Sequence, residues 1–166
     1  PESRMVSIPP DTSYVNFTRK EDELPHPSDV PLIAFTSDRD GDDEIFIMDK
    51  DGGSLQQLTH NTCADHSPSW SPDGTKLIYT SNCAGNSNDI YTMNIDGNNI
   101  QRLTIGVIQA YLPKFSPDGS KIVYQAHDPS GKTSIYVMDS NGSNIKLLSN
   151  SYDEAPDWSP DGSKIV

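Results

Sequence analysis

Residues 68–74 read Pro-Ser-Trp-Ser-Pro-Asp-Gly, and the last four residues of this stretch, Ser-Pro-Asp-Gly, occur three times in the chain. The copies begin at Ser71, Ser116 and Ser159, which are 45 and 43 residues apart. Each copy follows an aromatic residue, and a proline stands two positions before each aromatic residue. A motif that returns at such an interval is typical of proteins built from repeated structural units. We therefore expect an array of similar modules.

The middle unit contains four short segments of strand-forming residues. Its Ser-Pro-Asp-Gly predicts a tight turn, because proline presets the first central backbone angle and glycine accepts a left-handed conformation. A second turn is predicted at Asp96-Gly97, a common hairpin signal. No segment shows helical periodicity, so each unit should be four antiparallel strands. The strands expected in the middle unit are 68–71, 76–81, 89–94 and 100–104.

Apolar residues occupy both faces of the predicted strands. The third strand of each unit carries a methionine at a 45-residue interval, and the fourth ends on a leucine at the same interval. A sheet that is apolar on both faces must be covered on both sides. Sheets stacked face to face around an axis meet this requirement, which predicts an all-β fold of four-stranded β-propeller blades. A β-solenoid is the alternative, although its turns are usually shorter than this repeat.

The repeated pattern resembles a known family. Pro-x-aromatic-Ser-Pro-Asp-Gly is followed by an apolar pair with Tyr, then Ile-Tyr-x-Met-Asn/Asp, Asp-Gly and Leu-Thr. This order is similar to the WD40-like (PD40) blades of TolB-type propellers, over about residues 31–166. The resemblance implies a role in cell-envelope complexes. It transfers no partner-binding residues, because only the blade-forming motif matches.

The units predict about three and a half blades. Propellers usually have about four to eight blades, so three interpretations stay open. The chain is a fragment of a larger protein, which we favour, or several copies associate into a ring, or a four-bladed ring joins both termini in its last blade. The expected segments are an irregular stretch at 1–30, a partial blade at 31–60, blades at 61–105 and 106–150, and a half blade at 151–166.

The composition limits the classes of partner. Acidic residues outnumber basic ones by 24 to 12, and the formal net charge is −12. Such a field repels nucleic acid and anionic lipid. No apolar stretch approaches the roughly 20 residues of a membrane helix. We therefore expect neither nucleic acid nor a membrane as partner, and no cofactor.

The connections between strands vary in length on one face only. From the methionine to the leucine across the third turn the spacing is ten residues in all three units. Connections on the other face differ from unit to unit, and binding residues concentrate in such loops. This face is acidic, so a partner protein with a basic surface would complement it. The expected partner-binding residues are Asp38, Arg39, Asp40, Asp42, Asp43, Asp65, His66, Asp128, Asp153 and Glu154.

An acidic run on this face has a second interpretation. Asp38, Asp40 and Asp42 alternate as oxygen ligands of calcium can. The run departs from an EF-hand loop, because Gly41 stands at the fourth position and no helices flank it. A solvated acidic loop is the simpler interpretation, and calcium is the alternative.

The two cysteines are predicted on the same face of the same blade. Cys63 lies in the loop that leads into the blade, and Cys83 lies between its second and third strands. We predict a disulfide, which implies an oxidising compartment, the periplasm or the cell exterior. Free thiols remain an alternative, as does a zinc site in which His60 and His66 join the cysteines.

The sequence contains no Gly-x-Ser-x-Gly, no His-Glu-x-x-His and no phosphate-binding glycine loop. These are the motifs that carry common hydrolytic and nucleotide chemistry. We therefore predict no catalytic residues, and a non-enzymatic scaffold for protein–protein interaction. The alternatives are an accessory propeller of a larger peptidase-like or lyase-like enzyme, and a module that binds calcium or a glycan.

Overall fold

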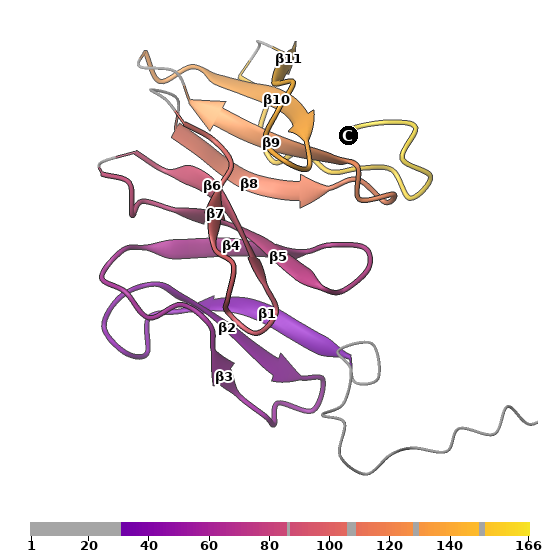
Figure 1. Cartoon of the computed structure of the whole chain (residues 1–166). Coiled ribbons are helices and arrows are strands. Elements are labelled where there is room, and N and C mark those ends of the chain that lie inside the picture. Colours follow the sequence, from indigo (N-terminus) through magenta and orange to yellow (C-terminus); the bar gives the residue numbers. More distant parts are fainter. Residues whose placement is uncertain (1–30, 86, 106–108, 128–129, 150–151) are drawn as a thin grey trace, which may run out of the picture.

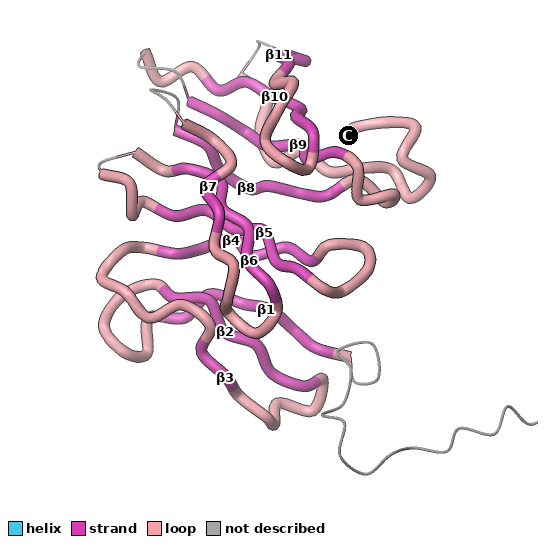
Figure 2. The backbone as a smooth tube through the Cα atoms, viewed as in Figure 1, coloured by secondary structure: helices cyan, strands magenta, loops and turns pink. Residues whose placement is uncertain are grey.

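The computed structural model describes residues 31–85, 87–105, 109–127, 130–149 and 152–166. The stretch expected to be irregular, 1–30, lies outside the described residues. The described residues form eleven β-strands and no helix, and Figure 2 shows them as short magenta segments joined by loops. In the described part of the chain, no helix has the length and apolarity needed to cross a lipid bilayer.

The strands form three antiparallel sheets that follow one another along the chain and stack face to face (Figure 1). Their orders are β1-β2-β3, β4-β5-β6-β7 and β8-β9-β10-β11. A bridge between Trp158 and Ile165 begins a further pair. The predicted all-β fold of propeller blades is confirmed. The strands are β1 (Leu32–Ser37), β2 (Glu44–Asp49), β3 (Gln56–Gln57), β4 (Asp65–Trp70), β5 (Lys76–Ser81), β6 (Asp89–Asn94), β7 (Gln101–Arg102), β8 (Gln109–Phe115), β9 (Lys121–His127), β10 (Thr133–Asp139) and β11 (Lys146–Ser149).

The strands of the second sheet test the predicted bounds. The two central strands, β5 and β6, begin and end where they are predicted. The first strand, β4, begins three residues earlier than predicted, and the last, β7, has only two residues. The ladder of β7 is short because the N–H of Ile90 donates to the hydroxyl of Thr104 at 2.9 Å. A side chain thus takes the place of a main-chain acceptor.

A left-handed residue precedes each repeated proline. Ser67, Leu112 and Ala155 have φ of 58°, 51° and 52°, in a region that residues other than glycine seldom occupy. At the first two positions the pairing of β4 and β8 with their neighbours shifts register. Such a bulge bends the strand and increases its twist. It explains how β4 extends to both sides of a proline.

The Ser-Pro-Asp-Gly turns share one hydrogen-bond pattern. The hydroxyl of Ser71 donates to Asp73 at 2.6 Å and accepts the N–H of Lys76 at 2.9 Å. The same two bonds recur in the turns that begin at Ser116 and Ser159. Serine is therefore a structural part of the turn, since its side chain closes the hairpin that the proline starts.

Successive turns also pack on one another. A Cβ added at Gly119 would lie 3.6 Å from Cδ of Pro72. Gly162 approaches Pro117 in the same way, at 3.5 Å. The glycine of one turn thus accommodates the proline of the turn before it. The repeated motif joins neighbouring sheets as well as neighbouring strands.

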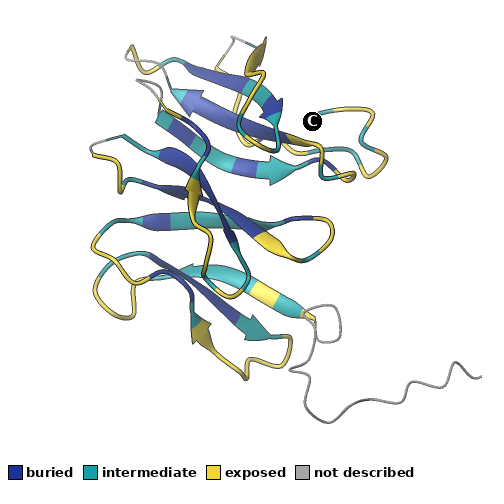
Figure 3. Cartoon of the chain, in the orientation of Figure 1, coloured by how far each residue is buried: buried dark blue, intermediate teal, exposed yellow. Residues whose placement is uncertain are grey.

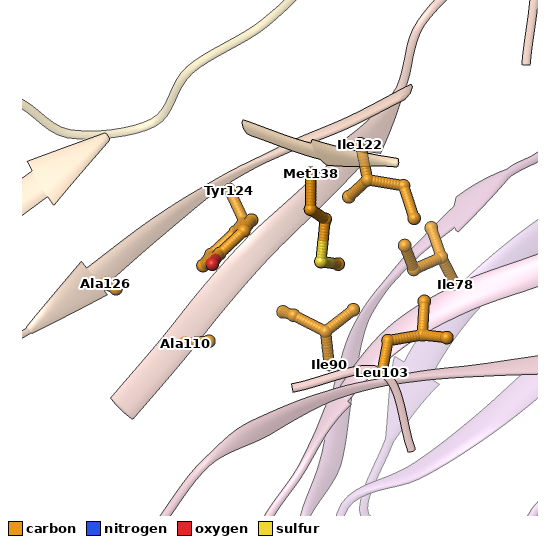
Figure 4. Close-up of a cluster of buried hydrophobic side chains, with 8 residues drawn as sticks. All are labelled: Ile78, Ile90, Leu103, Ala110, Ile122, Tyr124, Ala126 and Met138. Atoms are coloured by element: carbon orange, nitrogen blue, oxygen red, sulfur yellow. The ribbon is translucent and has the colours of Figure 1, made fainter. Parts of the chain in front are cut away.

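Neighbouring residues of β5 point to opposite faces of the second sheet and enter different cores. Leu77 packs in a cluster with Ile45 of the first sheet. Ile78 packs with Ile122 and Met138 of the third sheet, in the cluster drawn in Figure 4. Figure 3 shows the resulting band of buried residues through the central strands. Full burial of each such side chain contributes about 1.5–3 kcal/mol.

Replacing Asp73, Asp118 and Asp161 together by Asn should flatten the dependence of the melting temperature on pH. Hydrogen bonds, first those from Ser116 and Ser159, lower the pKa of Asp118 and of Asp161 to about 2. The ordinary pKa is about 4. The stabilisation is therefore present above pH 4 and is lost as the pH falls through 2. Circular-dichroism melts from pH 6 to pH 2 would measure this, and identical profiles for variant and wild type would contradict it.

Candidate functional site

The loops of varying length lie together along the left edge of Figure 1. They include the β1–β2 connection at 38–43 and the β3–β4 connection at 58–64. The β5–β6 connection lies beside them. The Ser-Pro-Asp-Gly turns after β4 and β8 lie at the opposite ends of the strands. We call the side with the varying loops the loop face.

The residues expected to bind a partner differ in exposure. Asp38, Arg39, Asp40, Asp153 and Glu154 are exposed, and Asp42, Asp43 and His66 are half-buried. Asp128 lies outside the described residues. The hydroxyl of Ser149 donates to Asp153, which connects the end of β11 with the following loop. The loop face therefore presents carboxylates from the first and the last described connections.

Asp65 corrects one expectation, because its side chain is buried and not on the surface. It is the first residue of β4 and is 1% exposed. Its N–H donates to the carbonyl oxygen of Asp43 at 2.7 Å, and its carboxylate accepts the side-chain amide of Asn61 at 2.7 Å. This carboxylate is consequently part of the packing beneath the loop face.

Arg39, the basic residue of the acidic run, turns back onto the sheet. Its guanidinium carbon lies 4.5 Å from the centre of the Phe46 ring and 5.4 Å from that of Phe35. Its Nε donates to the hydroxyl of Ser37 at 2.9 Å. Stacking on aromatic faces is a favourable arrangement for guanidinium. The charge of Arg39 is thus directed at the rings of β1 and β2.

In the second sheet a buried carboxylate is neutralised by an arginine. Asp89, the first residue of β6, is 0% exposed. Its two oxygens accept hydrogen bonds from Arg102 at 2.7 Å and from the hydroxyl of Thr104 at 2.8 Å. Arg102 also donates to the carbonyl oxygen of Thr104 at 2.9 Å. Both carboxylate oxygens and the charge are therefore satisfied within one blade.

The first sheet has the same arrangement without the cation. Glu44 stands 45 residues before Asp89 and is also 0% exposed, while Gln57 stands 45 residues before Arg102. One oxygen of Glu44 accepts the N–H of Asn61 at 2.7 Å, and the other has no hydrogen-bond partner. The carboxylate of the first sheet thus lacks the positive charge that its counterpart has.

The environment of Glu44 shifts its proton affinity. Burial raises the pKa of the Glu44 carboxyl above its ordinary value. Hydrogen bonds from Thr59 and Asn61 oppose this rise in the pKa, and the neighbouring carboxylates of Asp65 and Asp42 add to it. Burial and nearby negative charge both disfavour the ionised form of a carboxyl group, so these two causes act in the same direction.

Cys63 and Cys83 form a disulfide between two loops of the loop face. Their Cα atoms are 5.1 Å apart, and the bond joins residues separated by 20 positions. The thiolates that the alternative zinc site would need are therefore absent from this pair. Sγ of Cys83 lies 3.3 Å from Oδ1 of Asn61, and the N–H of Cys63 donates to the same oxygen at 2.6 Å. The disulfide thus holds the residue that binds both Glu44 and Asp65.

A row of rings crosses the boundary between the second and third sheets. The rings of His66 and Tyr111 are stacked with centres 6.3 Å apart, and those of Tyr111 and His127 are 5.0 Å apart. Asn88 donates to the Tyr111 hydroxyl at 2.9 Å, and Gln125 lies 2.9 Å from Nε2 of His127. His66 is therefore a packing residue between sheets as well as a residue of the loop face.

Sequence reasoning missed the residues that organise this face. Asn61 and Gln57 belong to no motif, and acidic residues such as Glu44 are expected to be exposed. A signal was nevertheless present in the repeat. Comparison of equivalent positions pairs Glu44 with Asp89 and Gln57 with Arg102, which reveals a carboxylate whose expected cation is missing.

Reducing the disulfide, or replacing both cysteines by Ser, should lower the free energy of unfolding by about 3 kcal/mol, because the cross-link limits the unfolded chain. Urea denaturation with and without dithiothreitol would measure the change. The double serine variant is the control, since dithiothreitol should leave its transition unmoved. An equal transition for oxidised and reduced wild type would contradict the prediction.

Arg102→Met should lower the free energy of unfolding by about 3 kcal/mol, because it leaves Asp89 buried without its cation. Lys50→Met is the matched control. Lys50 pairs with Asp51 on the surface, where the two side chains are 60% and 78% exposed, and such pairs contribute at most about 1 kcal/mol. Urea denaturation of both variants compares them. Equal losses of unfolding free energy in the two variants would contradict the prediction that the buried pair contributes more than the surface pair.

Comparison with known proteins agrees with the fold. The Tol-Pal system protein TolB of Desulfosudis oleivorans is 47% identical over 49 residues, which are 30% of this chain and 11% of that protein. The uncharacterized peptidase YuxL of Bacillus subtilis is 40% identical over 53 residues, 31% of this chain and 8% of that protein. The matches thus span a small part of the length of these relatives.

Solved structures give the same result over most of the chain. TolB from Acinetobacter baumannii superposes with a TM-score of 0.70 and 26% identity, over 84% of this chain and 35% of that one. An oligogalacturonate lyase from Vibrio parahaemolyticus shares the fold at a TM-score of 0.61 and 16% identity, over 81% of this chain and 41% of the lyase. The family model of the TolB beta propeller domain matches residues 25–166. The chain therefore belongs to the TolB beta-propeller (PD40) family.

Proposed function

We propose that this chain is a non-enzymatic scaffold that binds a partner protein through its loop face. The observation that carries the proposal is the set of exposed carboxylates there, Asp38, Asp40, Asp153 and Glu154, in a chain of net charge −12. Arg39, which stands among them in sequence, is stacked on aromatic rings. A basic protein surface would find electrostatic complementarity on this face.

Relatives support a role in protein assembly. The relative from Desulfosudis oleivorans is named a Tol-Pal system protein, and this name describes that relative as one component of a system. By analogy, the partner of this chain is another protein of the cell envelope. The disulfide between Cys63 and Cys83 supports an oxidising compartment, the periplasm or the cell exterior.

The side chains of the loop face support binding better than catalysis. The sequence contains no common nucleophile or zinc-hydrolase motif. The histidines of this region are used in packing: His66 contacts Tyr111 across the boundary between the second and third sheets, and His127 contacts Tyr111 within the third sheet. Rigid strands with loops at one end are a frequent design for recognition surfaces.

Replacing Asp38 by Asn and Glu154 by Gln should weaken partner binding several-fold, because it removes two exposed charges from the loop face. The immobilised chain would be incubated with a soluble envelope fraction of the source organism, and retained proteins would be identified by mass spectrometry. Retention should decline as NaCl rises from about 0.05 to 0.5 M, since salt screens exposed charges.

The matched control changes the net charge equally on the opposite side of the molecule. Asp51 and Asp96 are exposed in the turns after β2 and β6, and both become Asn. This variant should retain the same proteins as wild type. Equal losses in the two variants would show that net charge alone attracts the retained proteins, which would contradict a site on the loop face.

A second candidate function is an accessory propeller of a larger enzyme. The match to the peptidase YuxL and the shared fold of the lyase favour it. The natural protein decides between the two candidates, through its intact mass and complete sequence. A covalently attached hydrolase or lyase domain, with activity on a peptide or an oligogalacturonate, would favour the enzyme. A natural protein made of propeller and partner-binding domains would favour the scaffold.

A further inference from the structure

We infer that Asp40, Asp42 and Glu44 form a binding site for one calcium ion where the β1–β2 loop enters β2. One carboxylate oxygen of each residue lies within 4.8 Å of those of the other two. Two oxygens that share a calcium ion at about 2.3–2.6 Å are at most about 5 Å apart. The three carboxylates are therefore close enough to contact one ion. The group differs from the alternating aspartates of the sequence, since Glu44 takes part and Asp38 does not.

A buried and unpartnered oxygen points to a ligand at this place. Glu44 is 0% exposed, and its Oε2 has no hydrogen-bond partner, whereas its Oε1 accepts the N–H of Asn61. Oδ2 of Asp42 is also buried without a partner. Ionised oxygens without compensation are strongly unfavourable inside a protein. A cation bound by these two residues together with Asp40 would compensate the buried negative charge.

Among the described residues, no basic side chain forms a salt bridge with these carboxylates. The second sheet places Arg102 against Asp89 at 2.7 Å, but the first sheet has the neutral Gln57 at the equivalent position. Gln57 donates to Asp40 at 2.5 Å. The buried carboxylate of the first sheet therefore lacks the positively charged partner that its counterpart in the second sheet has.

The ligand set favours a hard cation of calcium's size. All three donors are carboxylate oxygens, and calcium takes six to eight oxygen ligands in flexible geometry, including water. Asp40 is exposed, so an ion can reach the group from solvent, while Glu44 forms its inner wall. The disulfide-linked loop supports this wall through Asn61. This site does not depend on the proposed partner binding.

The experiment compares calcium binding by wild type and two variants after treatment with a chelator. Isothermal titration calorimetry with calcium chloride should show one ion per chain. At about 100 times the dissociation constant, calcium should raise the melting temperature by about 5 °C or more. Magnesium at equal ionic strength should have a smaller effect, because it demands shorter bonds and loses water reluctantly.

Glu44→Gln should reduce calcium affinity at least tenfold, since it removes the innermost charge but keeps the shape. Without calcium it should melt at or above the wild-type temperature, because an unpaired buried charge is gone. A misfolded variant would melt lower, so the two effects are separable. Asp38→Asn is the matched control, with the same charge change in the same loop, and should keep the affinity within about threefold.

Three results would overturn the inference. They are no calcium-dependent heat or melting shift in wild type, an equal loss of affinity in Asp38→Asn and Glu44→Gln, or a shift with magnesium that matches calcium and survives in Glu44→Gln. Should Glu44→Gln fail to fold, Asp42→Asn removes the charge of the other carboxylate that has a buried, unpartnered oxygen, and it must lose calcium affinity in the same way.

Discussion

Each sheet of this protein is apolar on both faces, and the rest of the structure follows from the need to cover them. Leu77 and Ile78 are neighbours in β5, yet they enter cores on opposite sides of the second sheet. A single blade cannot satisfy both residues, so the blades must stack. The stacking in turn requires edges of similar shape, which the repeated bulges and turns provide.

The repeated turns explain why variation collects at the other end of the strands. Each Ser-Pro-Asp-Gly turn closes its own hairpin through serine and contacts the next turn through glycine. A change in its length would disturb two blades together. The connections on the loop face lack this repeated proline–glycine contact, and they differ in length and in charge. Recognition is therefore expected where the packing leaves freedom.

Much of the fold could be predicted from the sequence, because apolar periodicity and turn chemistry are local signals. β5 and β6 have the predicted bounds. β7 is shorter than predicted, because Thr104 replaces a main-chain acceptor with its hydroxyl. This exchange of a main-chain acceptor for a side-chain acceptor depends on contacts between strands. Local residue preferences do not reveal it.

The site was harder to predict, because burial of charge is decided by distant residues. Asp65 and Glu44 are residue types that usually lie on the surface, yet both are buried. Asn61, in the loop at 58–64, forms hydrogen bonds with both of them. The repeat held the necessary comparison, since Gln57 replaces the arginine of the next blade. Comparing equivalent positions of the repeated units can therefore predict which carboxylates have a positively charged partner. The comparison must be made before acidic residues are assumed to be exposed.

The disulfide and the buried carboxylates form one mechanical unit. Asn61 accepts the N–H of Cys63 and lies against Sγ of Cys83, while its own N–H and amide serve Glu44 and Asp65. The cross-link holds both cysteines against Asn61 and thereby fixes the loop that presents these donors. The disulfide therefore does more than limit the unfolded chain. It keeps in place the donors that make buried negative charge tolerable at the first blade.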